Sequence, residues 1–323
     1  MEVPLIKACL QPAAAHIDGA RPGEGCQRDP AVGAMKRRVL LIANRHSRRG
    51  DLDLGGVAGR LRAGGLLPEI VPLPRKGGLG DLLRERGRAF DLVMLGGGDG
   101  TMNAAAAALL EVGRPLAVLP LGTGNDLART LGIPLDPLTA AEVAAAGRMR
   151  RIDLGLVNGR PFFNVASVGL SVRVAKALGK DVKRRLGSLG YPLTVWRVLQ
   201  EGAAFSAEIR CGGEAHRLRS IQVAVGNGRY YGGGMVVDEE AWIDDHLLHL
   251  YSLRPLPLWR LAWHALDLRR GRHDDPEVAL SLQGRGFEVV TARPMEVNTD
   301  GEVTTRTPAR FSVLPEALEV VVP

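Results

Sequence analysis

The amino-acid sequence predicts an α/β plus β fold, in which an N-terminal α/β domain with a mostly parallel sheet precedes a C-terminal antiparallel β-sandwich domain. In the first half of the chain, short apolar runs alternate with helix-forming segments, as in a parallel sheet covered on both faces. Beyond about residue 148, strand-like segments joined by glycine-containing turns dominate, which favours an antiparallel sandwich. The 323 residues suffice for two domains of ordinary size.

The predicted α/β domain covers residues 35–148. Its expected strands are Val39–Asn44, Glu69–Leu73, Leu92–Leu95 and Leu116–Leu119. Its expected helices are Leu52–Gly64, Gly80–Arg88, Met102–Val112 and one that begins with Asp126–Thr130. Ligands of parallel sheets bind beyond the carboxyl ends of the strands, so we expect a binding site in the loops that follow these strands.

The predicted β-rich domain covers residues 149–307. Its expected strands are Arg151–Val157, Pro161–Val168, Phe205–Arg210, Leu218–Gly226, Leu247–Leu253 and Phe287–Val297. The segments that indicate helices are Val172–Gly179, Tyr191–Glu201 and Leu256–Leu268. Many strands with few helices predict a sheet or sandwich here.

The first 34 residues show neither helical nor strand periodicity. They also lack the basic start and continuous apolar centre of a secretory signal. Met35 leads directly into the first predicted strand. We therefore interpret residues 1–34 as a disordered extension, or Met35 as the physiological start.

Composition narrows the class of protein. A hydrophobic content of 46% with 24% charged residues is typical of a globular chain, and no apolar run approaches the roughly 20 residues that span a bilayer. Cys9, Cys26 and Cys211 are too few and too scattered for a disulfide framework or a zinc site, which favours a reducing, cytoplasmic location.

The net charge of +7 and the pI near 9.7 indicate attraction to anionic surfaces. No nucleic-acid module is visible, and aromatic residues make up only 4% of the chain, so we expect no nucleic-acid partner. Acidic lipid head groups are then the expected anionic partner of this positive charge. The alternative is a solvated basic surface without a partner.

Two glycine-rich turns carry the strongest functional signal: LGGGDGTMN at Leu95–Asn103 and LPLGTGND at Leu119–Asp126. Glycines let a backbone turn tightly and approach a ligand, and the helix expected after Thr101 would direct free N–H groups at an anion. Asp99 places a carboxylate beside this anion site, which implies a cation between them or a proton to be moved. The sequence thus predicts a nucleotide site.

These motifs resemble the diacylglycerol-kinase-type catalytic domain of lipid kinases, which has GGDGT, an asparagine two residues on, and LPxGTxND about twenty residues later. The resemblance extends over roughly Met35 to Pro323. It is supported by the matches at Asn44, Ser47, Gly190–Tyr191, Ile243–Leu248 and Asp300–Gly301–Glu302. The first turn alone also resembles NAD kinases.

The resemblance implies a fold of the NAD kinase and diacylglycerol kinase type, with ATP and Mg²⁺ as cofactors. It also implies that the last strand, Ala317–Val322, returns to the first domain, so that residues 308–323 complete it. The residues expected to bind nucleotide are Asn44, Ser47, Gly97, Gly98, Asp99, Gly100, Thr101, Asn103, Gly122, Thr123, Asn125 and Asp126. Plain turns are the alternative, and Asp126 is either a helix cap or part of a metal network.

Asp300 resembles the catalytic aspartate of the family. Its role would be to accept the proton of a lipid hydroxyl that attacks the γ-phosphate, with Glu302 supporting a cation or orienting Asp300. Asp99 competes for the role of base, and we favour it as a ligand of the metal or its water network. A simple Asp-Gly hairpin turn is the alternative for Asp300.

Asp244 and Asp245 resemble a structural cation site of bacterial members, whose motif usually runs DDGxL. His246 replaces the glycine here, and two exposed turn carboxylates are the alternative. A basic cluster, defined as Lys176, Lys180, Lys183, Arg184 and Arg185, either forms a solvated face or holds the second domain on anionic lipid.

We therefore expect a cytoplasmic, peripherally membrane-associated lipid kinase that uses ATP and Mg²⁺ and acts on a lipid such as diacylglycerol or a sphingoid base. The sequence allows a homodimer and does not decide the oligomeric state. The alternatives are a soluble-metabolite kinase of the NAD kinase type and a non-catalytic protein that senses lipid or nucleotide. The absence of GxxxxGK[ST] excludes a P-loop mechanism.

Overall fold

The computed structural model describes residues 37–43, 46–47, 50–74, 77–177, 194, 196–198, 200, 202, 204–232, 234–238, 241–264, 267, 270–271 and 275–323. The expected extension at residues 1–34 therefore lies outside the described residues. So do Asn44 and all of the basic cluster except Lys176.

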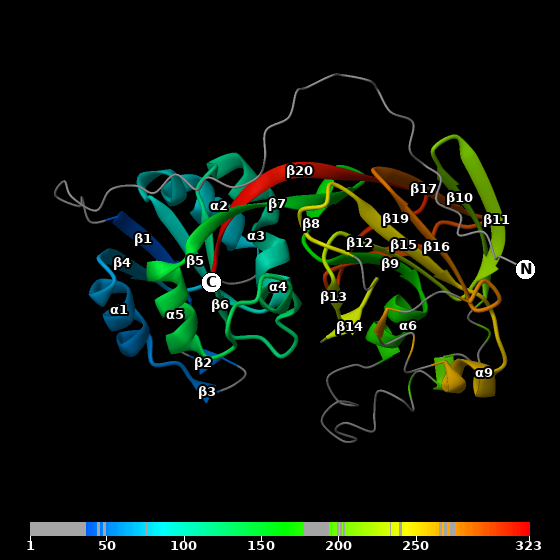
Figure 1. Cartoon of the computed structure of the whole chain (residues 1–323), viewed down its shortest axis with the longest axis horizontal. Coiled ribbons are helices and arrows are strands. Elements are labelled where there is room, and N and C mark those ends of the chain that lie inside the picture. The colour runs from blue at the N-terminus through cyan, green and yellow to red at the C-terminus, as the bar shows by residue number, and fades with distance from the viewer. Residues whose placement is uncertain are drawn as a thin grey trace, which may run out of the picture.

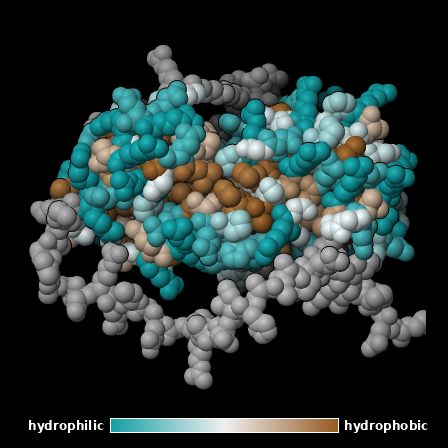
Figure 2. Space-filling view, turned by 90° about the horizontal axis from the view of Figure 1, so that it is seen from above, coloured by the Kyte–Doolittle hydropathy of each residue, from teal (hydrophilic) through white to brown (hydrophobic). Residues whose placement is uncertain are grey.

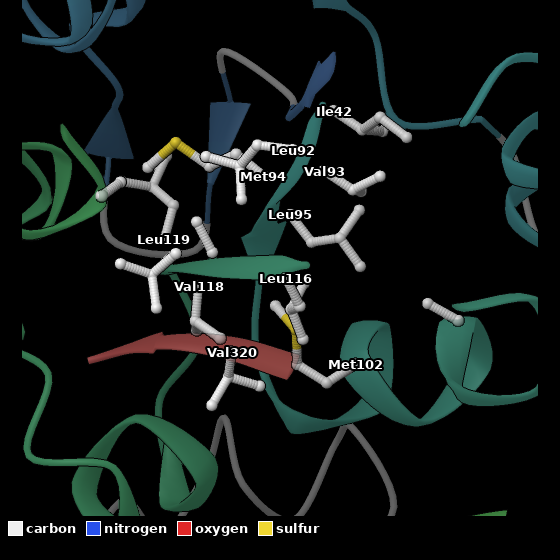
Figure 3. Close-up of a cluster of buried hydrophobic side chains, with 14 of the residues drawn as sticks. Ile42, Leu92, Val93, Met94, Leu95, Met102, Leu116, Val118, Leu119 and Val320 are labelled. Carbon is white, nitrogen blue, oxygen red and sulfur yellow. The ribbon is translucent and has the colours of Figure 1, made fainter. Parts of the chain in front are cut away.

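A parallel sheet forms the centre of the first domain. Its strands lie in the order β4 (Leu66–Val71), β1 (Arg37–Ile42), β5 (Leu92–Gly97) and β6 (Leu116–Pro120), and each neighbouring pair is parallel. Residues 39–42 of β1, residues 92–96 of β5 and all of β6 are apolar and buried (Figure 3). Strands buried on both faces are continuous apolar runs rather than alternating ones, which is why the sequence pattern revealed them.

Helices cover both faces of this sheet (Figure 1). On one face, α1 (Leu54–Ala63) packs against α5 (Pro137–Ala146), and on the other α2 (Gly78–Arg86) packs against α3 (Asp99–Val112). The shorter elements are η1 (Gly87–Ala89), α4 (Asp126–Thr130), β2 (His46–Ser47) and β3 (Gly50–Asp51). We did not predict α5, although Asp136 caps it by accepting a hydrogen bond from the Thr139 N–H at 2.9 Å.

The second domain is a sandwich. One layer is a six-stranded sheet in the order β16 (Ala279–Gly284), β15 (Leu248–Leu253), β12 (Gln222–Gly226), β9 (Val165–Gly169), β18 (Glu296–Thr299) and β19 (Glu302–Arg306). The opposing layer contains β7 (Arg148–Val157), β8 (Arg160–Phe162), β10 (Phe205–Cys211), β11 (Glu214–Ser220), β17 (Gly286–Thr291) and β20 (Ala309–Val322). Side chains from both layers, such as Phe311 and Val223, form one buried core.

The two domains share one continuous sheet, because β20 runs from the sandwich into the α/β domain. At its start β20 pairs antiparallel with β17, and near its end it pairs parallel with β6 at Val320 and Leu116. It also pairs with β7 along most of its length. In a view from above, apolar residues show through at the middle of the molecule, between two largely hydrophilic ends (Figure 2).

The predicted fold class is confirmed, with several differences in the sandwich. Three expected strands are each divided in two, giving β8 and β9, β11 and β12, and β17 and β18. The separating segments are short, since Ile221 lies between β11 and β12 and Phe163 and Asn164 lie between β8 and β9. Arg293 and Pro294, between β17 and β18, mark a break that the expected strand passed over. We also did not predict β16 or β19, or the first half of β20.

The remaining elements lie on the outer side of the six-stranded sheet (Figure 1). They are α6 (Leu170–Ala177), α9 (Leu258–Trp263), and the two-stranded pair of β13 (Tyr230–Tyr231) and β14 (Met235–Val236). Over the residues that the structure describes, no helix combines the length and apolar character needed to cross a bilayer.

We predict that Val320→Ala lowers the free energy of unfolding by about 2–3 kcal/mol, because it leaves a cavity in the strand that joins the two domains. Val320 is 0% exposed, whereas Val303 on β19 is 47% exposed. The matched control Val303→Ala should stay within about 0.5 kcal/mol of wild type. Urea unfolding of both variants checks this, and equal losses would contradict the central role of β20.

Candidate active site

The two glycine turns touch through their backbones. A Cβ on Gly122 would lie 2.5 Å from the Cα of Gly98, and a Cβ on Gly98 would lie 2.9 Å from the Cα of Gly122. Real Cβ atoms do not approach other atoms this closely, so both positions require glycine for close approach. A Cβ on Gly97 would likewise clash with the side chain of Thr101.

The first turn leads directly into α3, which begins at Asp99 rather than at the expected Met102. The N–H groups of Thr101 and Met102 both donate to the carbonyl of Gly98, at 2.9 and 3.2 Å. The turn therefore ends where the positive end of a 14-residue helix begins. Such a helix start suits a phosphate group.

Asp99 connects the two turns. Its Oδ1 accepts a hydrogen bond from the N–H of Leu127 at 3.1 Å, in the first turn of α4. Its Oδ2 has no hydrogen-bond partner within the described part of the chain. Asp126 begins α4 and is buried. Carboxylates from both turns thus lie near the start of α3, and carboxylate oxygens suit Mg²⁺.

Asn125 shapes the second turn with its side chain. It adopts a left-handed backbone with φ of 53°, and its Oδ1 accepts from the N–H of Gly122 at 2.8 Å while its Nδ2 donates to the Gly122 carbonyl at 2.9 Å. Asn125 therefore holds the turn with both ends of its amide, and its expected contact with nucleotide stays a prediction. Thr123 is exposed at the tip of the turn and can reach one.

Asp300 lies in the tight turn between β18 and β19, in a left-handed conformation with φ of 48°. The Oδ2 atom accepts from the N–H of Phe163 at 2.8 Å, and the Oδ1 atom accepts from the N–H groups of Asn164 and Val165, both at 3.0 Å. The Asp300 N–H in turn donates to the Val165 carbonyl. The carboxylate is therefore held by three consecutive backbone N–H groups, a set we call the Asp300 cradle.

Burial raises the pKa of Asp300 to about 6 from its ordinary value of 3.8, because an ionised carboxylate is costly away from water. The three N–H groups of the cradle oppose this shift by favouring the charged form, and the negative charge of Asp99 adds to it. The group therefore changes its protonation state close to neutral pH. Such a value is suited to a general base.

The turn that carries Asp300 contacts α3. Asn103 on α3 donates from its Nδ2 to the Thr299 carbonyl at 3.1 Å. A Cβ on Gly100 would lie 3.9 Å from Oε1 of Glu302, so this exposed glutamate faces the start of α3. Residues almost two hundred positions apart in the chain are thus brought to one place.

Asn227 is a site residue that the sequence analysis missed. It is buried, and its Nδ2 donates to the carbonyls of Asp153 and Phe163 at 3.0 and 2.9 Å. Its own N–H and that of Gly228 donate to the Asn164 carbonyl. Asn227 therefore orients the peptides that form the Asp300 cradle. The available signal was Asn227-Gly228 directly after an apolar strand, which sequence alone does not separate from an ordinary turn.

Three amide oxygens around the cradle are buried without a hydrogen-bond partner among the described residues: Oδ1 of Asn103, Asn164 and Asn227. Buried polar atoms are almost always paired with protein, water or ligand. Two of these residues hold the cradle and the third contacts the turn of Asp300. The region is therefore built to accept donors from water or a bound molecule.

Asp244 and Asp245 are engaged by protein groups. The Asp244 carboxylate accepts from Arg150 Nε at 2.8 Å and from its Nη2 at 2.5 Å. Asp245 accepts from the N–H of Leu247 and from Nε2 of His249. Among the described ranges no three or more His, Cys, Asp and Glu side chains gather as a metal site. The cation at this pair stays a prediction, and Arg150 and His249 are the positive groups already present.

His249 is buried between two carboxylates. Its Nδ1 bonds to Asp238 at 3.0 Å and its Nε2 bonds to Asp245 at 2.9 Å. Burial by itself would lower the pKa of His249, but the hydrogen bonds and charges of Asp238 and Asp245 outweigh it and raise the pKa to about 9. The protonated imidazole therefore ties β15 to the segment that follows β14.

His246 takes the left-handed conformation of the glycine that it replaces in the family motif, with φ of 60°. Its N–H donates to Asp153 Oδ2 at 2.7 Å, and its ring bonds to Oδ1 of the same carboxylate at 3.1 Å. These two contacts offset the strain of a side chain in this conformation. The tight turn survives the substitution.

Some predicted residues remain without a described side chain. Asn44 lies outside the described residues, and for Ser47 only the backbone of β2 is described. Lys176 ends α6 and forms an ion pair with Glu296. The structure therefore brings together Asp99, Asn103, Asp126, Asp300 and Glu302, and it leaves the expected contacts of Asn44 and Ser47 as predictions.

Comparisons with known proteins agree with this geometry. The family model described as diacylglycerol kinase catalytic domain matches residues 38–157, and the YegS C-terminal NAD kinase beta sandwich-like domain matches residues 164–322. A probable lipid kinase YegS-like of Pseudomonas aeruginosa (strain UCBPP-PA14) is 38% identical over 240 residues, which are 72% of this chain and 77% of that protein. A probable lipid kinase YegS-like of Pectobacterium atrosepticum is 34% identical over 298 residues, which are 88% of this chain and 96% of that protein.

Solved structures support the same arrangement. A crystal structure of a putative diacylglycerol kinase from Bacillus anthracis superposes with a TM-score of 0.77 and 27% sequence identity. The match covers 89% of this chain and 97% of that chain. Both domains are therefore shared with that protein.

We predict that Gly122→Ala lowers the free energy of unfolding by about 2 kcal/mol or more, because its Cβ would collide with the backbone of the first turn. Gly59, in the middle of α1, has open space where a Cβ would stand. The control Gly59→Ala should therefore stabilise the protein by about 0.5–1 kcal/mol. Thermal and urea unfolding check both; a neutral Gly122→Ala would mean that the turns do not touch.

We predict a pH-dependent stability difference between wild type and Asp300→Asn. The unfolded carboxyl ionises near 3.8 and the folded one at about 6, so wild type loses stability as the pH rises between these values and the neutral variant does not. The variant should thus gain about 2.4 kcal/mol relative to wild type between pH 4 and pH 7. Urea unfolding across this range measures the difference, and a constant difference would argue against a raised pKa.

Proposed function

The chain belongs to the family that joins a diacylglycerol kinase catalytic domain to a YegS-type C-terminal domain, and from this premise we propose that it transfers the γ-phosphate of ATP to a lipid hydroxyl. One observation supports the proposal: the turn that carries Asp300 contacts α3, the helix that begins at the first glycine turn. Diacylglycerol and sphingoid bases are the acceptor classes that we propose.

In this proposal the nucleotide phosphates lie against the two glycine turns. The N-terminal N–H groups of α3 and the hydroxyls of Thr101 and Thr123 would donate to them. Asp99 and Asp126 would hold Mg²⁺, which supplies charge neutralisation for the phosphates when bound. Asn125 keeps the second turn in shape through both ends of its amide.

Asp300 is proposed as the general base. As the acceptor oxygen forms its bond to the γ-phosphorus, the bond from that phosphorus to the leaving oxygen of ADP breaks, and the hydroxyl proton passes to Asp300. Its Oδ2 accepts only one hydrogen bond, from Phe163, so a lone pair remains for that proton. Glu302, beside Gly100, would orient the acceptor or Asp300.

The favoured location is cytoplasmic, with peripheral attachment to an anionic membrane where the acceptor resides. A soluble-metabolite kinase is the second candidate, because the C-terminal family model is described as NAD kinase beta sandwich-like. The acceptor screen below separates the two. A homodimer is one possible oligomeric state, and sedimentation velocity measures which state the protein adopts.

We predict that Asp300→Asn lowers kcat by about 10²–10⁴-fold, since the hydroxyl proton loses its acceptor. The assay is transfer of labelled γ-phosphate from Mg-ATP to lipid alcohols in mixed micelles, with NAD in a parallel reaction. In wild type, kcat/KM should rise with pH through about 6 as the Asp300 carboxyl of the free enzyme ionises. ATP affinity should stay within about threefold of wild type.

The matched control is Asp81→Asn, which removes an exposed carboxylate from α2 and should leave transfer unchanged. Transfer to NAD alone would establish the soluble-metabolite kinase instead. Loss of ATP binding in a folded Asp300→Asn protein would overturn the assignment of Asp300 as base. ATP binding without transfer to any acceptor would favour a sensing role.

A further inference from the structure

All four tryptophans of the chain are exposed. Tryptophan is usually well buried because of its large apolar surface, so this distribution is unusual. Two of them, Trp259 and Trp263, are four residues apart on α9 and are 71% and 81% exposed. Side chains at this spacing lie on the same face of a helix, so α9 presents a pair of indoles to its surroundings.

The helix that carries them is anchored to the domain. Pro257 precedes α9, and its carbonyl accepts hydrogen bonds from the N–H groups of Arg260 and Leu261. Arg260 Nη2 bonds to Glu277 at 2.8 Å. The indole pair therefore projects from a helix that these contacts hold in place. The Arg260 side chain, which lies between the two indoles in sequence, bonds to Glu277.

The position of α9 relates the pair to the site. It lies on the same side of the six-stranded sheet as α6 (Figure 1), and α6 packs on β9 and β18. These two strands meet at Asp300, which follows β18 and bonds to the Val165 carbonyl of β9. A membrane on this side would thus lie next to the strands that lead to the proposed base.

We propose that the α9 indole pair docks the second domain on a lipid bilayer with anionic head groups. The inference rests on the proposed function, in which the acceptor is a lipid. Indole has an apolar body and an N–H donor, and it concentrates at the boundary between acyl chains and head groups. The net charge of +7 and the exposed Arg254 and Arg270 on either side of α9 favour an anionic surface.

The test is co-sedimentation of the full chain with vesicles of phosphatidylcholine containing phosphatidylglycerol. Trp259→Ala/Trp263→Ala should bind at least about tenfold more weakly than wild type, because each indole removes a large apolar area from water on docking. The matched control is Trp242→Ala. Trp242 is 58% exposed but precedes Ile243, which packs in the core of the first domain, so this variant should bind like wild type.

A second readout keeps this inference separate from the proposed function. The double variant should phosphorylate a short-chain, water-soluble diacylglycerol like wild type while losing turnover on vesicles. If wild type binds vesicles through α9 but phosphorylates no lipid, the docking surface stands and the proposed function fails. Equal vesicle binding by wild type and double variant, or no vesicle binding by wild type, would overturn the docking surface. So would a shift from dimer to monomer as the sole effect of the double variant.

Discussion

The pairing of β7 with β20 is the constraint on which the rest of the structure depends. These two antiparallel strands cross the domain boundary together, and β20 ends paired with β6 in the parallel sheet. Their register shifts between Leu314 and Leu318, where Glu316 adopts a φ of 48° and its N–H donates to Asp153. The same carboxylate holds His246. The buried carboxylate of Asp153 thus holds both the bend in β20 and the turn before β15. These two contacts help to fix the position of one domain on the other.

This placement creates the electrostatic character of the site. Asp99 belongs to the first domain and Asp300 to the second, and only their proximity adds repulsion to the burial of Asp300. A buried carboxylate with three N–H donors remains ionisable near neutral pH because the donors offset part of the desolvation cost. The two glycine turns supply the complementary positive end of α3. Phosphoryl transfer requires mainly positioning and electrostatic stabilisation, and both follow from how the domains meet.

A similar balance of charges organises the region around β15. Arg150 pairs with Asp244, and the protonated His249 lies between Asp238 and Asp245. Paired charges of this kind can be buried, whereas a lone one is costly. The segment between β12 and β15, which includes β13 beside α4, is thereby fixed against the second glycine turn. The sandwich therefore contributes to the shape of the proposed nucleotide site and also carries the proposed base.

By itself, the sequence determined the fold class and both glycine turns, since buried parallel strands are apolar runs and tight turns near phosphate need glycine. It also identified Asp300, through its place in an ordered set of motifs. Only the tertiary structure decided that the amide of Asn125 holds its own turn, that Asn227 orients the Asp300 cradle, and that the last strand begins at Ala309 and so belongs to both sheets. Those roles depend on contacts between residues far apart in the chain, such as Asn227 with Phe163. Local patterns record the preference of a segment for a conformation, and they carry no information about which distant groups it will meet.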